Sequence, residues 1–410
     1  MKKDTLIASV LAYGTFTVII AVLVAVLFNV GGIRDVRPGQ FSDRNMLQAL
    51  WHQYKLEYLE PGTMRALDKS QDNITTSEGQ SYTMLRAVWL DDKETFDTAW
   101  QWTKDNIQRK NDHLLSWLFG ERPDGSYGVL VERGGENAAT DADTDAALAL
   151  IFAWRRWNDQ SYFGDAILMI RDIWAKEVIM IAGKPYLLAN NVEKTAPKQY
   201  VLINPSYFAP YAYKVFATVD QTHDWLGLAA TSYEVAQAAI KAPLDKETSG
   251  GLPPDWIAID KKTGELVMPQ SGGDQNLTTN YSFDALRMSW RFALDWRWNQ
   301  DERAKTVLSA MNLLSREWDE HGSLAASYAH DGTRISNMES LAMYGGSLGY
   351  FVVSDPRAAR DIYRKKLEAV YDPNESKWNV GQGYYDDNWA WFGMALYTDG
   401  LQDLSLKANE

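Results

Sequence analysis

The sequence predicts an all-α protein with small β-hairpin insertions, and three observations lead to that class. From about residue 43 onward, amphipathic or apolar helical stretches follow one another, and helix pairs recur roughly every 45–60 residues. Gly, Pro, Asn and Asp separate these stretches. No glycine-rich phosphate loop follows a strand, and strands and helices do not alternate, which excludes a parallel-sheet nucleotide-binding fold. One large helical domain over residues 43–410 fits this pattern better than several small domains.

The chain begins with a predicted membrane segment. Residues 5–28 carry no charge; as a helix they would span roughly 36 Å, which exceeds the ~30 Å hydrocarbon core. The run is longer than a signal-peptide core and lacks a clear A-x-A cleavage site. We therefore expect a transmembrane signal anchor over residues 1–30 and a linker over residues 31–42. A cleaved signal peptide, which would release the domain, and a buried core helix are the alternatives.

Periodicity predicts the helices that follow. Phe96, Ala99, Trp100 and Thr103 form one apolar stripe at i, i+3, i+4 and i+7 spacing. In chain order, helices are expected at about residues 96–107, 144–157, 207–218, 225–241, 282–298, 302–318, 356–370 and 386–398.

Two short segments resemble hairpins. Residues 184–191 and 199–206 flank a polar turn, and residues 255–260 and 265–270 flank the turn Lys261–Gly264. Each pair is expected to form a small antiparallel insertion between helices.

Composition narrows the function. The net charge of −13, from 41 basic and 54 acidic residues, argues against nucleic acid as a partner. The chain has no Cys and its five His show no HExxH spacing, so neither a metal nor an organic cofactor is predicted. The 17 Trp and 21 Tyr exceed ordinary use. Aromatic rings pack cores and also stack on sugar faces, so they raise the expectation of a carbohydrate groove.

The first candidate site is the segment Ser77-Glu78-Gly79-Gln80. It follows a polar loop and opens an apolar helical run. Ser77 is a good N-cap residue, and Gln80 three positions later would complete a capping box. The segment alone therefore predicts a helix start, with Glu78 in its first turn.

The second candidate is the run Asp141, Asp143 and Asp145 at the head of an apolar helix. Three alternating carboxylates are costly there unless they are capped, hydrogen-bonded or bound to a ligand. A calcium loop is rejected because Ala146 and Phe152 stand where the EF-hand pattern requires Gly and Glu. Helix capping is the simple alternative.

The third candidate is Asp284, which lies three residues before Arg287 on a predicted helix. This spacing is typical of an ordinary ion pair on a helix surface. Phe283, Met288 and Trp290 surround the pair and indicate a partly buried carboxylate. The three candidates together supply separated carboxylates on different helix starts, the set that polysaccharide hydrolysis needs.

The sequence at this point resembles glycoside hydrolase family 8. Four segments match the family's motifs in the family's order. They are Ser77–Tyr82, Ala139–Asp143 with Ala153 and Trp157, Asn204–Phe208, and Asp284 with Arg287, Trp290 and Arg291. The resemblance covers roughly residues 43–400.

The resemblance implies an (α/α)6 barrel and inverting endo-hydrolysis of a β-1,4-linked polysaccharide. It implies Glu78 as general acid, Asp284 as general base, and Asp141 as the residue that holds the distorted sugar. The substrate is expected to be cellulose-like β-glucan, with xylan and chitosan as further candidates. The other expected substrate-binding residues are Asp143, Gln80, Tyr207, Arg287, Trp117, Tyr384 and Tyr385.

By the same resemblance, the enzyme would trim an exopolysaccharide at the cell surface or in the periplasm. It would be a membrane-anchored monomer, or a secreted one if the anchor is cleaved, with a polysaccharide synthase complex as a candidate partner. Two other functions stay open. A polysaccharide lyase would need a Tyr or His base and suits uronates, which the charge of −13 disfavours. A non-catalytic polysaccharide-binding protein would use the aromatic groove alone.

Overall fold

A computed structural model describes residues 40–270, 277–380 and 383–406 of the chain. The chain divides into two compact units, residues 1–45 and 46–410. Within the described ranges, no helix is long and apolar enough to cross a lipid bilayer. The predicted anchor, residues 1–30, lies outside those ranges. Residues 40–42, predicted as the end of the linker, instead begin helix α2 (Gln40–Tyr58).

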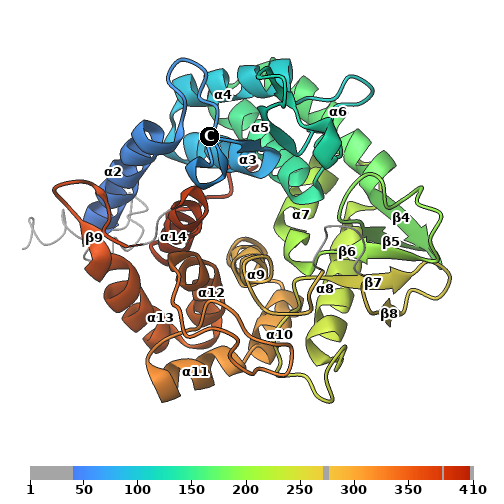
Figure 1. The fold of residues 1–410 in the computed structure, drawn as a ribbon, viewed down its shortest axis with the longest axis vertical. Coiled ribbons are helices and arrows are strands. Elements are labelled where there is room, and N and C mark those ends of the chain that lie inside the picture. Colours follow the sequence, from blue (N-terminus) through green and yellow to red (C-terminus); the bar gives the residue numbers. More distant parts are fainter. Residues whose placement is uncertain (1–39, 271–276, 381–382, 407–410) are drawn as a thin grey trace, which may run out of the picture. The chain divides into compact units, whose positions relative to one another are not determined.

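Six helices of the second unit form a closed inner ring, in which each helix contacts the next and the last contacts the first (Figure 1). In ring order they are α3 (Ser77–Leu90), α5 (Thr140–Trp157), α7 (Pro210–Val219), α9 (Leu286–Asn299), α12 (Leu341–Ser354) and α14 (Tyr384–Tyr397). This is the arrangement of an (α/α)6 barrel, so the expected helical class is confirmed.

The other helices pack on the outside of this ring, mostly each against the inner helix that precedes it (Figure 1). They are α4 (Lys93–Asn106), α6 (Gln160–Glu177), α8 (Trp225–Lys241), α10 (Glu302–Ala310), α11 (Leu313–His321) and α13 (Pro356–Ile362). Short 3-10 turns lie at Lys69–Gln71, Val131–Arg133, Pro205–Tyr207 and Glu368–Val370, and a π-helical turn lies at Tyr363–Leu367.

Aromatic packing fills the centre of the ring. The indole of Trp290 on α9 lies 5.7 Å, centroid to centroid, from Trp389 on α14 and 6.2 Å from Tyr211 on α7, both nearly edge-on. Trp89 on α3 contacts the same indole. Edge-to-face pairs of this kind are favourable beyond their buried area. Many of the aromatic residues therefore build the core.

Helix α12 lies unusually close to its neighbours because it is rich in glycine. A Cβ atom on Gly345 would lie 1.9 Å from the main-chain oxygen of Trp389 on α14, and one on Gly349 would lie 2.4 Å from that of Ser289 on α9. Its sequence, LAMYGGSLGYFVVS, predicts no helix by intrinsic propensity, since glycine disfavours helices. Packing overrides propensity here, and the helix was not predicted.

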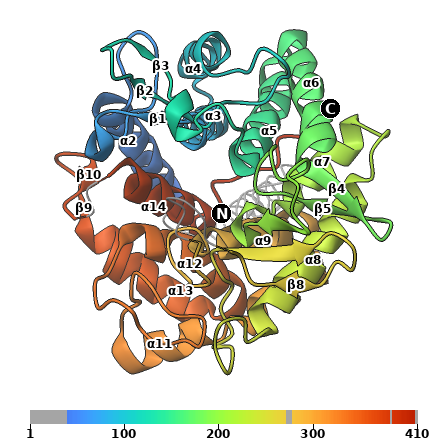
Figure 2. The ribbon, with the colours of Figure 1, turned by 45° about the vertical axis from the view of Figure 1, so that its right-hand side comes forward.

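Small antiparallel sheets decorate the ring. One joins β1 (Thr75–Thr76), β2 (Leu118–Glu121) and β3 (Tyr127–Val129), another joins β4 (Val178–Ile181) to β5 (Lys184–Leu187), a third joins β6 (Tyr200–Ile203), β7 (Ile257–Asp260) and β8 (Leu266–Val267), and the last joins β9 (Tyr371–Asp372) to β10 (Lys377–Trp378). The β4–β5 and β7–β8 strands lie beside α8 (Figure 2).

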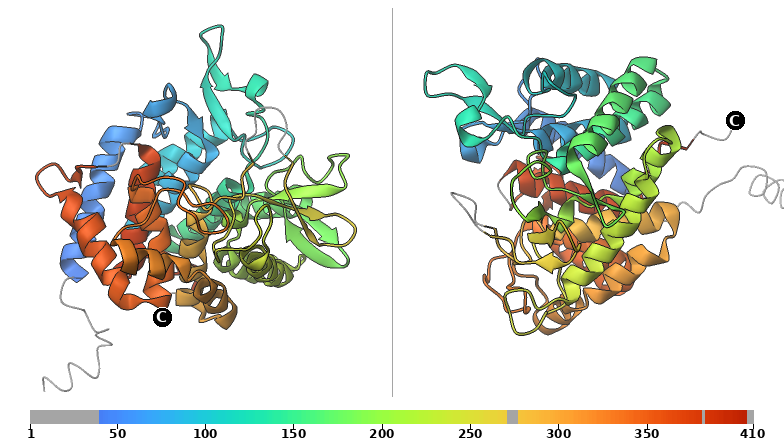
Figure 3. Two further views of the ribbon diagram at one scale, coloured as in Figure 1. Left: turned by 60° about the horizontal axis from the view of Figure 1, so that its bottom comes forward. Right: turned by 90° about the vertical axis from the view of Figure 1, so that its right-hand side faces the viewer.

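The predicted hairpin at 255–270 is confirmed, but the one at 184–206 is wrong. Strand β5 pairs with β4 upstream, and β6 pairs with β7, more than fifty residues later. The alternation of apolar residues marked the strands correctly and could not identify their partners. The β2–β3 hairpin, which projects beyond the helices, was not predicted (Figure 3).

Helix positions were predicted more closely than helix ends. The stripe on α4 is buried as expected. The predicted helix at 302–318 is two helices, α10 and α11, broken at Met311 and Asn312. The predicted helix at 356–370 changes to π and 3-10 turns after Ile362. Helix α9 begins only at Leu286, which leaves Asp284 in the turn before it.

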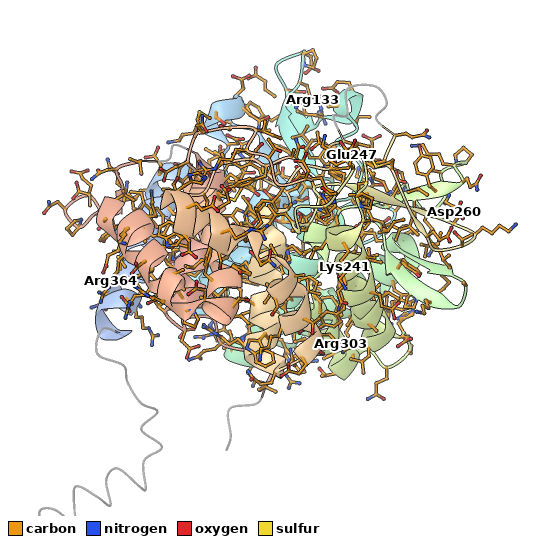
Figure 4. The ribbon with its side chains drawn as sticks, turned by 90° about the horizontal axis from the view of Figure 1, so that it is seen from below. Arg133, Lys241, Glu247, Asp260, Arg303 and Arg364 are labelled. Atoms are coloured by element: carbon orange, nitrogen blue, oxygen red, sulfur yellow. The ribbon has the colours of Figure 1, made fainter. Side chains whose placement is uncertain are left out.

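The first turns of the inner helices meet at one end of the ring, where the β2–β3 hairpin also lies. In Figure 4, Arg133, close to that hairpin, lies at the opposite end from Arg303, in the first turn of α10. The candidate functional residues come from the end of the ring marked by Arg133.

Candidate active site

Glu78 is the second residue of α3, and its helix start differs in detail from the prediction. The cap is Thr76, whose hydroxyl accepts a hydrogen bond from the main-chain N–H of Gly79 at 3.0 Å. Gln80 does not close a capping box. Its amide oxygen accepts from Ala66 N at 2.6 Å and its amide nitrogen donates to Thr103, so it is fully buried. Gln80 therefore joins α3 to Ala66 and Thr103, and its predicted role in substrate binding stays a prediction.

Arg287, the second residue of α9, is the centre of the site. Its Nη1 donates to Oε2 of Glu78 at 2.6 Å and to Oδ2 of Asp141 at 2.9 Å. Its Nη2 donates to Oδ1 of Asp284. The side chain of Arg287 is only 2% exposed, whereas those of Glu78 and Asp284 are 18% and 32% exposed. One buried cation thus joins three carboxylates, two of which reach the solvent.

Other groups orient Arg287 and the two exposed carboxylates. Ser206, in the turn before α7, accepts from Nε of Arg287 at 3.1 Å, and the ring of Tyr207 lies 5.1 Å from its guanidinium carbon. The Tyr384 hydroxyl donates to Oε1 of Glu78 at 3.2 Å. Five inner helices thus contribute to one site through their first turns or the turns just before them.

The aspartates of α5 separate onto different faces of the helix. Asp141 binds Arg287, and four residues later Asp145 forms a two-pronged ion pair with Arg291 at 2.7 and 2.8 Å. Residues four apart lie on one helix face, so α5 and α9 are joined by two successive buried pairs.

Asp143 faces away from that pair of contacts. It is fully buried, and its Oδ1 accepts from Leu115 N at 2.8 Å. Burial is the main cause of a raised pKa for both Asp143 and Glu177, a neighbouring buried carboxyl on α6. Asp143 therefore makes no contact with the carboxylates that Arg287 joins, and its predicted role in substrate binding stays a prediction.

The remaining predicted residues lie around the site without touching the carboxylates. Trp117 is partly exposed, and its indole donates to Gly134 O at 2.9 Å beside the β2–β3 hairpin. The Tyr385 hydroxyl donates to the main-chain oxygen of Phe283 in the turn that carries Asp284.

Trp256 is a site residue that the sequence analysis missed. It lies just before β7, and its indole N–H donates to Oδ2 of Asp284 at 3.1 Å. Its ring also packs edge-on against Tyr207, with centroids 6.1 Å apart. The sequence placed Trp256 in a hairpin, and only the pairing of β7 with β6 brings it to the site.

The two partly exposed carboxylates differ in their burial and in their hydrogen bonds. Burial, opposed by the charge of Arg287 and reinforced by the charges of Asp141 and Asp284, raises the pKa of Glu78 to about 7. A carboxyl with that pKa can hold a proton near neutral pH and release it to a substrate. Asp284 is more exposed, and both of its oxygens accept hydrogen bonds, one from Trp256 and one from Arg287.

The shared guanidinium limits the separation of the acid and base candidates. Its two terminal nitrogens are fixed in a planar fork, so the nearest oxygens of Glu78 and Asp284 lie within roughly 7 Å of each other. Inverting pairs are separated by roughly 6.5–9.5 Å and retaining pairs by about 5 Å. The limit is compatible with both ranges, so inversion stays a prediction. In the described ranges, no group of three or more His, Cys, Asp or Glu side chains could hold a metal.

Comparison with known proteins gives one consistent result. Residues 39–398 match the family model described as glycosyl hydrolases family 8. Endoglucanase 2 of Ruminiclostridium josui is 27% identical over 90% of this chain and 74% of its own length. Endoglucanase A of Acetivibrio thermocellus is 29% identical over 91% of this chain and 74% of its own length. The crystal structure of an endo-1,4-D-glucanase from Vibrio fischeri superposes with a TM-score of 0.71 at 27% identity, covering 85% of this chain and 94% of that one.

Proposed function

This chain belongs to glycosyl hydrolase family 8 and is a glycosidase, and we propose that it cuts internal β-1,4 bonds of a glucan with inversion, Glu78 acting as general acid and Asp284 as general base. One observation carries the assignment of roles. Glu78 and Asp284 project from the starts of two inner helices onto one guanidinium, and the pKa of Glu78 is about 7. The names of the relatives, which are endoglucanases, support β-glucan as the substrate class.

The reaction needs two proton movements on opposite sides of the scissile bond. The protonated Glu78 carboxyl donates its proton to the glycosidic oxygen, which leaves as a hydroxyl group. The ionised Asp284 takes a proton from a water molecule, whose oxygen attacks the anomeric carbon from the other face. Arg287 and Trp256 fix the two oxygens of Asp284, so the lone pair that receives the proton has a defined direction.

Asp141 and Tyr207 complete the proposed cleavage point. Asp141 is held by Arg287 and by the main-chain N–H of Ala142 at 2.9 Å, so its carboxylate is rigid. A rigid acceptor can bind sugar hydroxyls more strongly in the distorted ring than in the relaxed one. The partly exposed ring of Tyr207 lies beside Arg287 and offers a face for the sugar.

We also propose that residues 1–30 tether the enzyme to a membrane with the catalytic unit on the outer side. The uncharged run 5–28 supports this location, where the enzyme would meet a polysaccharide made by a neighbouring synthase. Membrane fractionation tests it, since an anchored chain stays in the pellet after a carbonate wash and a cleaved one appears in the supernatant.

The enzymatic proposal is tested by reducing-sugar release from β-glucan, carboxymethylcellulose, xylan and chitosan by the full chain. We expect release from the two glucans. The matched variant Glu78→Gln keeps the size of the side chain and removes its proton, so it should lose at least 10²-fold in turnover while it still binds the glucan. Equal turnover by the variant would remove Glu78 from the role of acid. Binding without release by the wild type would favour a non-catalytic binding protein.

A further inference from the structure

Asp255 is a buried carboxylate that lies beside the proposed base and has no part in the mechanism above. Its Oδ1 accepts hydrogen bonds from two main-chain N–H groups, Ser282 N at 3.2 Å and Ala285 N at 2.8 Å. Its Oδ2 accepts from the hydroxyl groups of Thr278 and Ser282. Asp255 therefore grips both ends of the turn that contains Asp284.

The turn that Asp255 holds leads directly into α9. Ala285 occupies the N-cap position of that helix and makes no side-chain capping hydrogen bond. The first helical N–H group, that of Leu286, instead donates to Ser282 O at 3.1 Å. Asp255, thirty residues away in sequence, accepts from the N–H groups of Ser282 and Ala285 and so holds the turn that receives the first turn of the helix.

The main chain that carries Asp255 is itself anchored. Asp255 N donates to Asn280 O at 2.6 Å, Trp256 N donates to Thr278 O at 3.0 Å, and the chain then enters β7, which pairs with both β6 and β8. Asp255 therefore lies in a bend two residues before a strand, and main-chain hydrogen bonds fix that bend. A carboxylate held in this way has a better-defined position than one on an unanchored loop.

The neighbouring residue acts on the same base from another side. The indole of Trp256 binds Oδ2 of Asp284, and Arg287 binds Oδ1. Asp255 in turn binds the main chain on both sides of Asp284. Asp255 thus restrains the backbone on both sides of Asp284, and Trp256 restrains the Asp284 carboxylate.

Resting on the proposed function, we propose that Asp255 is a positioning residue for the general base, holding the turn 282–285 so that the Asp284 carboxylate is aimed at the attacking water. Asp255 does not touch the reacting atoms. Its closeness to the base is also visible electrostatically, because burial and then the charge of Asp284 raise the pKa of Asp255 to about 7.

The first test compares two asparagine variants on soluble cello-oligosaccharides. Asp255→Asn keeps the size of the side chain but turns one acceptor into a donor that faces two hydroxyl groups. We expect kcat to fall about 10- to 100-fold with KM within about twofold, since a small misplacement of a catalytic group acts on turnover. The control is Asp245→Asn. Asp245 accepts from the Thr279 hydroxyl next to Thr278 but does not contact the base turn, so both constants should stay unchanged.

The second test separates positioning from general loss of structure. In an Asp284→Ala background there is no base left to position, so adding Asp255→Asn should leave the residual rate unchanged within about twofold. A further tenfold loss in that double variant would show that Asp255 acts on the fold as a whole and would overturn the proposal.

Two further outcomes are decisive. If Asp255→Asn does not fold, Ser282→Ala removes only one hydroxyl donor to Asp255 and should lower kcat about two- to fivefold at unchanged KM. Unchanged kcat in both variants, with an active wild type, would overturn the positioning role and leave the proposed function standing. A wild type that cleaves no cello-oligosaccharide would overturn the proposed function and, with it, this inference.

Discussion

Nη1 of Arg287 lies 2.6 Å from Oε2 of Glu78, and this contact ties the proposed acid on α3 to the helix whose preceding turn carries the proposed base. The same nitrogen lies 2.9 Å from Asp141. One guanidinium therefore serves three carboxylates, Asp284 being the third, and a single positive charge cannot balance them all. The excess negative charge, added to burial, explains why Glu78 retains its proton to about pH 7.

The raised pKa predicts how activity depends on pH. General-acid catalysis needs the protonated carboxyl, so kcat/KM should fall about tenfold per pH unit once the pH exceeds about 7. The measurement is kcat/KM on a soluble cello-oligosaccharide between pH 5 and 9. Tyr384→Phe removes a donor that stabilises the charged form of Glu78, so it should move the falling limb to higher pH. Undiminished activity at pH 9 would contradict the assignment.

The proposed inverting mechanism predicts which anomer is formed first. Water that is activated by Asp284 attacks from the face opposite Glu78, so each cut of a β-1,4 bond should first produce the α-anomer. Proton NMR during the first minutes of hydrolysis separates this product from the β-anomer before the two equilibrate. An initial β-anomer would mean that Asp284 attacks the carbon directly, as in retaining enzymes.

The close approach of α12 and α14 predicts an unusually sensitive glycine. Gly345→Ala would place a methyl group 1.9 Å from the Trp389 carbonyl oxygen, and that oxygen belongs to the main chain and cannot swing away. We expect a loss of about 3 kcal/mol in the free energy of unfolding. The control is Gly164→Ala on α6, where no atom lies within 4 Å of the new methyl group. There the variant should gain about 0.5–1 kcal/mol from helix propensity. Urea unfolding measures both.

The same glycines mark the limit of prediction from sequence. Periodicity located helices such as α4 and α8, because their apolar stripes are determined by a single face. Helix α12 is buried nearly all round, and Gly345 and Gly349 lower its propensity, so no local signal identified it. The glycines allow α12 to pack closely against α9 and α14. That contact exists only in the assembled ring and cannot be read from the local sequence.

The sequence likewise identified some properties of the site residues and not others. Glu78, Asp141 and Asp284 each begin or precede an apolar helix, and these carboxylates beside apolar runs were visible in the sequence. The motif resemblance could not separate the carboxylates that meet at Arg287 from Gln80 and Asp143, which are fully buried and bond to other segments. Their burial depends on neighbours that are distant in sequence.

The buried pair Asp143 and Glu177 predicts a pH-dependent stability. Burial and then the charge of Asp143 raise the pKa of Glu177 well above its ordinary value. The folded carboxyl thus stays protonated where the unfolded one has lost its proton, so stability is full below the unfolded pKa and falls as pH rises from about 4.5 toward the folded pKa. A variant whose side chain at position 177 cannot ionise should lose up to about 1.4 kcal/mol less stability per pH unit than the wild type does.

Glu177→Gln tests this dependence because the amide is uncharged at every pH. Between pH 5 and 8, its free energy of unfolding should decline less steeply than that of the wild type. Glu94→Gln, at an exposed position on α4, should decline in parallel with the wild type. Identical slopes for all three proteins would show that Glu177 is ionised in the folded state.

The closed ring also sets a condition on the order of synthesis. The ribosome makes α3 near the beginning and α14 near the end, yet the hydroxyl of Tyr384 on α14 binds both Thr76 and Glu78 at the start of α3. A nascent chain that has reached α12 already contains every proposed catalytic carboxylate. It still lacks α14, the helix that contacts Glu78 through Tyr384. Closure over such a long loop is slow, since its entropy is lost before the contacts form. The acid site is therefore complete only once α14 has been made, and a chain that ends before Tyr384 lacks its contact with Glu78.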